Sequence, residues 1–268
     1  MSCALARAAD TAVGRVAIQL GLVALLLALW QIAVGTGAAS AFLFGSPAGV
    51  ARIFWLRLAD YSLFYDIWIT VYEAMLGFVI GTAAGSLIGL ALWYSRFVAR
   101  TVEPLIVAFN SVPKIAFAPI VILWFGTGLY SKVALAISLT AIVALIAAYQ
   151  AVKDADPDLL SLLLTLGAGK NQIFRKVVIP SALPGIIATF RINVGFGLVG
   201  AVVGEFISSQ RGLGHMVFTA SSFYDLDTVW LGLFVLMAIG FLLYFIIDII
   251  ERRLLPWKMD QQRAELHV

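Results

Sequence analysis

A small group of polar side chains interrupts one of the long apolar runs of the sequence. Pro113 lies within the run from 104 to 125, and Asn110, Ser111 and Lys114 cluster beside it. A charged group among apolar residues is costly unless it meets water or a partner, so function is its default interpretation. Broken helices often line pathways because proline frees backbone carbonyls. We therefore expect Asn110, Ser111 and Lys114 to line a pathway for a solute.

Two carboxylates in other apolar runs complete this candidate pathway set. An ion pair between Lys114 and Glu73 or Glu205 is the structural alternative to a pathway role for Lys114. A second alternative is that the Lys114 side chain extends toward water at the membrane surface. Glu205 could also join a gate, although a position at the membrane interface or a pair with Arg211 is the simpler expectation. His215 has no second histidine or cysteine at ligand spacing, so no metal site is expected.

The sequence contains no pattern that would catalyse a reaction. The phosphate-binding pattern G-x-x-x-x-G-K-[ST] is absent from the 268 residues, so the chain cannot bind ATP by that route. No nucleophile lies beside a base, and no histidines are paired. We expect no cofactor and no catalytic residue, and any ATP that drives the protein must be bound by a partner subunit.

The composition places these residues in a lipid bilayer. Hydrophobic residues make up 62% of the chain, charged residues 12%, and the mean hydropathy is +1.00. Because about 20 apolar residues cross a bilayer, the runs predict an all-α integral membrane protein with six transmembrane helices. The six runs are 16–34, 67–93, 104–125, 132–150, 186–207 and 229–249.

The distribution of Lys and Arg predicts the orientation of these helices. With an even number of spans, the two ends of the chain share a side with the 94–103 loop and the 151–185 segment, and these regions hold most of the 18 basic residues. Both termini are therefore expected to be cytoplasmic. The net charge of +3 follows topology, so it does not indicate nucleic acid.

A basic stretch broken by proline lies within the long 151–185 segment. Asp156-Pro157-Asp158 predicts a helix start, "PDLLSLLLTL" a short helix, and Gly167 a left-handed stop. "KNQIFRKVVI" predicts a second short helix with Ile173, Phe174, Val177 and Val178 on one face. We expect Pro180 and Pro184 to end this helix and start the next span. Leucines surround the first helix, which predicts a partner that covers it.

This stretch resembles the cytoplasmic coupling loop of permease subunits from binding-protein-dependent ABC importers. Gly167 matches the glycine of the family loop, and Ile179-Pro180 with Leu183-Pro184 matches its end. "TVYEAMLGF", "SVPKIAFAPIVILWFGTGLYSK" and "VVGEFISSQRGLG" are similar to the nitrate, sulfonate and taurine branch, and the resemblance covers roughly residues 67–256.

The resemblance implies a type I importer permease in the bacterial cytoplasmic (inner) membrane. Its domains would be 1–66 (N-terminal cytoplasmic segment, first span and outer loop), 67–256 (permease core) and 257–268 (cytoplasmic tail). Its implied partners are two ABC ATPase subunits, a periplasmic or lipid-anchored substrate-binding protein, and a second permease copy in a homodimer. The residues implied to couple to the ATPase are Asp158, Ser161, Leu162, Leu163, Thr165, Gly167, Ala168, Lys170, Pro180 and Pro184.

The sequence departs from the family pattern at two places. Ser161-Leu162-Leu163 stands where the family has Glu-Ala-Ala, so the family's acidic contact with the ATPase has no counterpart there. Glu73 stands where this branch often has Arg. The implied substrate is a small anion such as nitrate, a sulfonate or taurine, and the alternative substrate is a thiamine-precursor pyrimidine or a similar small organic compound. An ion-coupled secondary transporter is the alternative function.

Glycines at strict spacing predict close helix packing in the second run. Gly77, Gly81, Gly85 and Gly89 recur every four residues and form one stripe. Gly200 and Gly204 form a shorter stripe in the fifth run. The helix that approaches these glycines could belong to the same chain or to a second copy.

Overall fold

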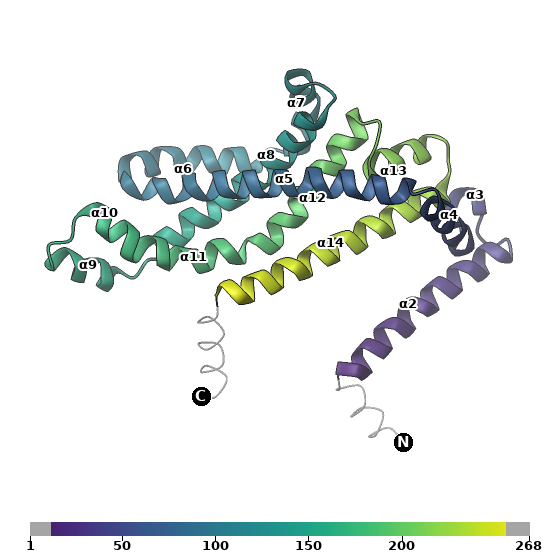
Figure 1. Ribbon diagram of the computed structural model, residues 1–268, viewed down its shortest axis with the longest axis horizontal. Helices are drawn as coiled ribbons and strands as arrows, with labels where there is room; N and C mark the ends of the chain where they lie inside the picture. The colour runs from purple at the N-terminus through teal and green to yellow at the C-terminus, as the bar shows by residue number, and fades with distance from the viewer. Residues whose placement is uncertain (1–11, 256–268) are drawn as a thin grey trace. The chain divides into compact units, whose positions relative to one another are not determined.

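The computed structural model describes residues 12–255, which are helical and contain no β-strand. The predicted cytoplasmic tail at 257–268 and the first residues of the predicted N-terminal segment lie outside this range. Figure 1 shows the long elements α2 (Ala12–Gly35), α5 (Ser62–Ala91), α6 (Arg96–Ser111), α8 (Leu129–Lys153), α12 (Phe190–Ser208) and α14 (Leu226–Leu254). The shorter α-helices are α3 (Ala41–Phe44), α4 (Pro47–Ala59), α7 (Ala118–Phe125), α9 (Pro157–Thr165), α10 (Lys170–Ile173), α11 (Ile179–Ala188) and α13 (Leu213–Ser222).

Five of these helices are long and apolar enough to cross a membrane. The five candidate spans are Gly14–Gly35, Ser62–Tyr94, Leu129–Lys153, Phe190–Ser208 and Leu226–Leu254. The third predicted run is different, because α6 and the segment Lys114–Phe125 meet at an angle of 84°. Pro113 lies at this bend, where its ring prevents the helix from continuing. The six predicted runs therefore become five continuous helices and one bent pair.

The chain forms two compact units. Among the described residues, the first unit contains 12–63 together with Met216–Phe234, and the second contains Phe64–His215 and 235–255. Within the first unit, the carboxylate of Asp227 accepts a hydrogen bond from the Ser46 backbone N–H at 2.6 Å, and the indole of Trp230 donates to the Phe44 carbonyl at 2.9 Å. These contacts tie the short helices α3 and α4 to the start of α14.

The second unit is built around α8, against which α5 and α12 pack. A Cβ on Gly77, Gly81 or Gly85 would overlap α8 at Ala136, Thr140 or Ala141, and one on Gly89 would lie 2.6 Å from the carbonyl oxygen of Leu145. On α12, a Cβ on Gly200 would overlap Ala136, and one on Gly204 would lie 2.8 Å from Lys132. Both predicted glycine stripes therefore serve packing inside the chain, because only glycine lets the backbones approach this closely.

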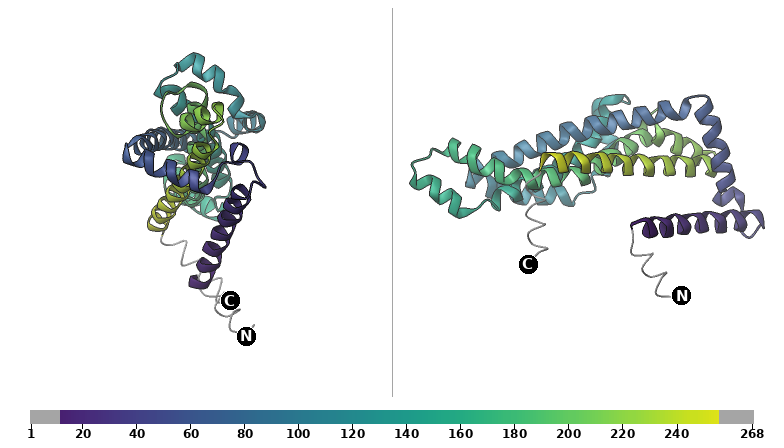
Figure 2. Two further views of the ribbon diagram at one scale, coloured as in Figure 1. Left: turned by 90° about the vertical axis from the view of Figure 1, so that its right-hand side faces the viewer. Right: turned by 60° about the horizontal axis from the view of Figure 1, so that its bottom comes forward.

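The segment that follows α8 turns back on itself beyond the ends of the long helices of the second unit (Figure 2). It consists of α9, a turn at Gly167, then α10, a π-helical turn (Phe174–Val178) and α11. The prediction that Pro180 and Pro184 end the second helix is wrong, because helix continues from Lys170 to Ala188. Pro180 directly follows the π-helical turn, and Pro184 lies inside α11.

Candidate functional site

The 151–185 segment, which we call the coupling segment, has the local structure that its sequence predicts. Asp156 caps α9, since its carboxylate accepts a hydrogen bond from the Asp158 N–H at 2.8 Å. Gly167 has φ 76°, as expected of a left-handed stop. The N–H of Gly167 donates to Leu164 and that of Ala168 to Leu163, both at 3.0 Å, so two terminal carbonyls of the helix are satisfied.

A small apolar core holds the coupling segment against the end of α8. Ile173 and Val178 are buried in one cluster with Ala148 and Val152, and Leu160 and Leu163 of α9 pack against this cluster. The predicted apolar face of the second helix is thus confirmed. The segment is also tied to the short 3-10 helix Leu92–Tyr94 that follows α5, because Lys170 donates to the Tyr94 carbonyl at 2.6 Å and Tyr94 donates to Asn171 at 3.1 Å.

Three other leucines of α9, and Leu166 directly after it, are exposed within the described structure. Leu159, Leu162, Leu164 and Leu166 are 46%, 53%, 62% and 71% exposed. The hydroxyl groups of Ser161 and Thr165 bond to carbonyls of their own helix, at Pro157 (2.8 Å) and Leu162 (2.7 Å). Asp158 is exposed in the first turn. An exposed apolar surface at the end of a rigid hairpin is suited to bind another protein.

The predicted pathway residues do not form one cluster. Lys114 bonds locally, since its ammonium group donates to the side-chain oxygen of Asn110 at 3.2 Å and to its carbonyl at 3.3 Å. Ser111 bonds to the Val107 carbonyl at 3.0 Å. The suggested ion pairs of Lys114 with Glu73 or Glu205 are wrong, because both carboxylates bond elsewhere. Lys114 lies just after α6, and its ammonium group folds back onto the end of that helix.

Glu73 and Glu205 instead lie side by side in a buried polar cluster. A carboxylate oxygen of Glu73 lies 3.6 Å from the ammonium group of Lys132. Glu205 is fully buried and accepts hydrogen bonds from the Thr70 hydroxyl at 2.7 Å and the Gly214 N–H at 2.6 Å. The expected pair of Glu205 with Arg211 is therefore wrong, and the expected position of Glu205 at the membrane interface stays a prediction.

The loop after α12 explains why Glu205 is buried. Residues 209–214 fold back so that the N–H groups of Gly212 and Leu213 donate to Asp66 and Thr70, at 3.0 and 2.9 Å. Gly212 has φ 101°, which confirms a turn at this residue, whereas Leu213 and Gly214, also expected in the turn, begin α13. Arg211 lies over the ring of Tyr65, with its guanidinium carbon 5.6 Å from the ring centroid.

Sequence reasoning missed several buried polar residues. Lys132, the first residue of the predicted run 132–150, lies in the first turn of α8 and is buried. Arg191 of α12 bonds to Asp248 and Glu251 of α14, each at 2.6 Å. The pairing of Arg191 had a signal in the sequence, since its two partners, Asp248 and Glu251, are one helical turn apart near the end of an apolar run. Lys132 had none, because its partner is 59 residues away in the sequence.

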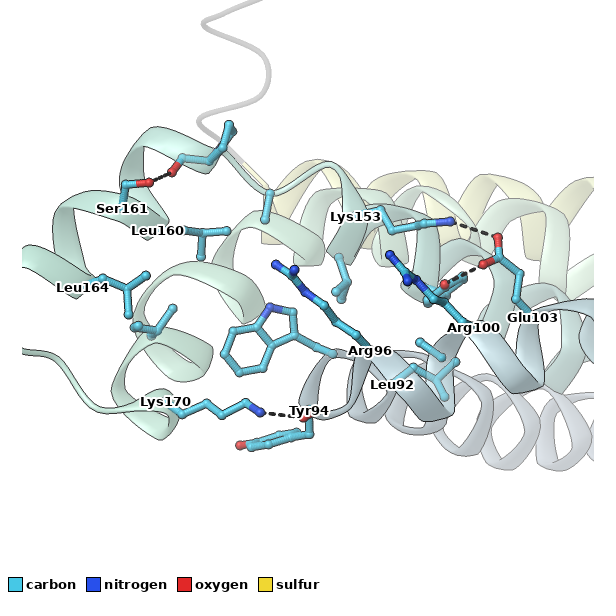
Figure 3. Close-up of a pocket in the computed structure, with 17 residues that line it drawn as sticks. Leu92, Tyr94, Arg96, Arg100, Glu103, Lys153, Leu160, Ser161, Leu164 and Lys170 are labelled. Atoms are coloured by element: carbon cyan, nitrogen blue, oxygen red, sulfur yellow. Dashed lines mark hydrogen bonds and ion pairs between the residues drawn. The ribbon is translucent and has the colours of Figure 1, made fainter.

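A pocket of about 770 Å³ opens beside the buried cluster. It is lined by polar groups that include Glu73, Lys132 and Arg211, and by the aromatic rings of Tyr65, Trp68 and Tyr72. A second pocket, of about 910 Å³, lies beside the coupling segment (Figure 3).

The chain matches a known family over most of its length. Residues 77–256 match the model of the family described as binding-protein-dependent transport system inner membrane component. The chain is 33% identical to a riboflavin transport system permease protein of Chloroflexus aurantiacus over 87% of each chain. It is 31% identical to a formylaminopyrimidine transport permease protein of Halalkalibacterium halodurans, over 88% of this chain and 94% of the other, and 31% identical to the taurine transport system permease protein of Escherichia coli, over 92% of each.

A solved structure shares the fold. The inward-facing MetNI methionine ABC transporter aligns with a TM-score of 0.64 and 23% sequence identity, over 72% of this chain and 96% of the other.

Proposed function

This chain belongs to the binding-protein-dependent transport system inner membrane components, the permease subunits of ABC importers, and we propose that its coupling segment is the docking site for a separate ATPase subunit. The observation that supports this proposal is the exposed surface formed by Leu159 and Leu162 of α9 and by Leu166 at its end. Closure of the ATPase would move α9, and the continuous helix from Lys170 to Ala188 would transmit this movement to α12.

We also propose the rest of the assembly, and the family of the chain supports it. Two permease copies enclose a pathway that one set of spans leaves open, and one coupling segment per copy engages one ATPase subunit. A substrate-binding protein delivers the solute on the opposite side, and both termini lie in the cytoplasm. ATP hydrolysis takes place on the ATPase subunits, so the permease itself is not an enzyme. A purified complex with a single permease copy would contradict this arrangement.

We propose a small anion, such as nitrate, a sulfonate or taurine, as the substrate. The taurine permease of Escherichia coli supports this class by its name. Two other relatives are named for riboflavin and formylaminopyrimidine transport, so a small organic compound such as a thiamine-precursor pyrimidine is the second candidate. The ligand of the cognate substrate-binding protein distinguishes the two classes.

A leucine substitution tests the docking surface. Leu162→Gln should reduce copurification of the coexpressed ATPase subunit, because it removes apolar contact area without disturbing the buried face of α9. Leu43→Gln is the matched control, since Leu43 is 63% exposed and lies in α3 of the first unit. Equal recovery of the ATPase with both variants would contradict the docking role. Uptake that needs no ATPase would favour an ion-coupled secondary transporter instead.

A further inference from the structure

A basic pocket lies where two candidate spans end. Trp93 and Tyr94 close the span Ser62–Tyr94, Lys153 closes the span Leu129–Lys153, and all three line the pocket of about 910 Å³. Trp and Tyr gather at the boundary between bilayer and water. The pocket therefore opens at the depth of lipid head groups, whichever side of the membrane it faces.

The lining of this pocket is strongly positive. Arg96 and Arg100 of α6, Lys153 of α8 and Lys170 of α10 contribute four cations, while Glu103 contributes the carboxylate. Glu103 is already engaged, since it binds the ammonium group of Lys153 at 2.9 Å and accepts a hydrogen bond from the Tyr149 hydroxyl at 2.9 Å. Lys170 is held by the Tyr94 carbonyl.

The two arginines remain available for a ligand. Arg96 and Arg100 are one helical turn apart, and Figure 3 shows both side chains extending from α6 into the pocket. Within residues 12–255, neither guanidinium has a hydrogen bond or a carboxylate partner. A guanidinium presents paired donors whose geometry matches a phosphate group.

The neighbouring surface of α6 is apolar. Phe97 is 79% exposed and lies three residues before Arg100, so the two side chains are neighbours on the surface of α6. A helix that presents both arginines and apolar side chains suits the boundary between acyl chains and head groups. This arrangement distinguishes a lipid site from a site for a soluble anion, which would not need an apolar surface next to the charges.

We propose that this pocket binds the phosphate group of an anionic phospholipid, with Arg96 and Arg100 as its principal ligands. Basic pockets between helices at a membrane surface bind such head groups. The bound lipid would contact both α6 and the face of α9 that points into the pocket, because Leu160, Ser161 and Leu164 of α9 line the same pocket. A soluble phosphate compound shares the chemistry of the head group, so the test compares both sources.

Native mass spectrometry of the purified permease with its ATPase subunits tests the proposal. Phosphatidylglycerol and phosphatidylcholine with identical acyl chains are titrated into the complex in detergent. The wild-type protein should retain phosphatidylglycerol in preference to phosphatidylcholine. Arg96→Gln/Arg100→Gln should weaken the binding of phosphatidylglycerol about tenfold, since each charge-assisted hydrogen bond contributes strongly. Arg96→Lys/Arg100→Lys should fall between the two, because the charge remains but the paired donors are lost.

The matched control removes the same charge outside the pocket. Arg175 and Arg253 are exposed and do not line it, so Arg175→Gln/Arg253→Gln should bind phosphatidylglycerol as the wild type does. Equal loss in both double variants would overturn the proposal, as would complete displacement of the lipid by millimolar inorganic phosphate, which would assign the pocket to a soluble anion.

The ATPase provides the remaining readout. Loss of the ATPase from the Arg96→Gln/Arg100→Gln complex, with lipid binding unchanged, would make the pocket part of the ATPase interface and overturn the lipid proposal. Weakened lipid binding with the ATPase retained supports it. The result is separate from the fate of the docking surface, which Leu162→Gln tests on the outer side of α9.

Discussion

The ammonium group of Lys132 lies 3.6 Å from the carboxylate of Glu73, and both side chains are more than nine-tenths buried. The pair joins the first turn of α8 to α5, and the carboxylate of Glu205 is buried beside that of Glu73. A buried charge whose partner is removed is left without compensation, which makes this pair a sensitive point for stability.

Removal of one member of this pair should destabilise the protein more than removal of both. Lys132→Met is expected to cost about 3 to 5 kcal/mol of stability, since it leaves Glu73 beside Glu205 without a counter-charge. Lys132→Met combined with Glu73→Gln should recover a large part of this loss. Thermal unfolding in detergent measures the effect. A double variant no more stable than Lys132→Met would mean that the two charges do not interact.

Two glycines of α12 should respond differently to the same substitution. A Cβ on Gly200 would overlap Ala136 of α8, whereas a Cβ on Gly195 has nothing within 4 Å. Gly200→Ala should therefore destabilise the protein by about 1 to 3 kcal/mol, because α12 must move away from α8. Gly195→Ala should be neutral or slightly stabilising, since alanine favours helix. Similar unfolding temperatures for both variants would contradict the packing described for these helices.

Lys114 should affect transport without affecting stability. Its two bonds to Asn110 are at a partly exposed position, so Lys114→Ala should change stability by no more than about 0.5 kcal/mol. If Lys114 faces the pathway of an anion, the alanine variant should lose uptake into vesicles, and Lys114→Arg should retain more of it because the charge persists. Normal uptake by Lys114→Ala, or loss of the protein from the membrane, would refute the pathway role.

Local chemistry made the coupling segment predictable from sequence. Asp156 and Pro157 mark the start of α9, and Gly167 marks its end, because each residue acts on the backbone within one turn of itself. The glycine stripe predicted close packing for the same reason. The helix that packs against this stripe was not predictable, since the same glycine spacing would suit a helix of this chain or of a second copy. In the structure, Thr140 of this chain packs against Gly81.

The buried polar cluster was not predictable because its partners are far apart in sequence. Thr70 and Glu205 are separated by 135 residues, and only the packing of α5 beside α12 brings them together. The continuation of helix past Pro180 depended on a π-helical turn, which has no reliable sequence signal. The bend at Pro113 was anticipated as a break, but its angle of 84° was not.

Substitution of Gly167 tests the coupling role most directly. Gly167 has φ 76°, whereas Gly169, two residues later, has φ −70° and ψ 159°, a conformation that valine adopts readily. No atom lies within 4 Å of a Cβ on Gly167, so the cost of valine there is conformational, about 1 to 2 kcal/mol or more. Such a cost should misplace α9 without disturbing the spans.

The decisive measurement is ATPase copurification together with transport-coupled ATP hydrolysis in vesicles, for Gly167→Val and Gly169→Val. We predict that both variants insert into the membrane in wild-type amounts. Gly167→Val should lose ATPase binding or substrate-stimulated hydrolysis, and Gly169→Val should keep both. Wild-type copurification and hydrolysis with Gly167→Val would show that the segment is only a connecting loop, and would contradict the docking of the ATPase at this site.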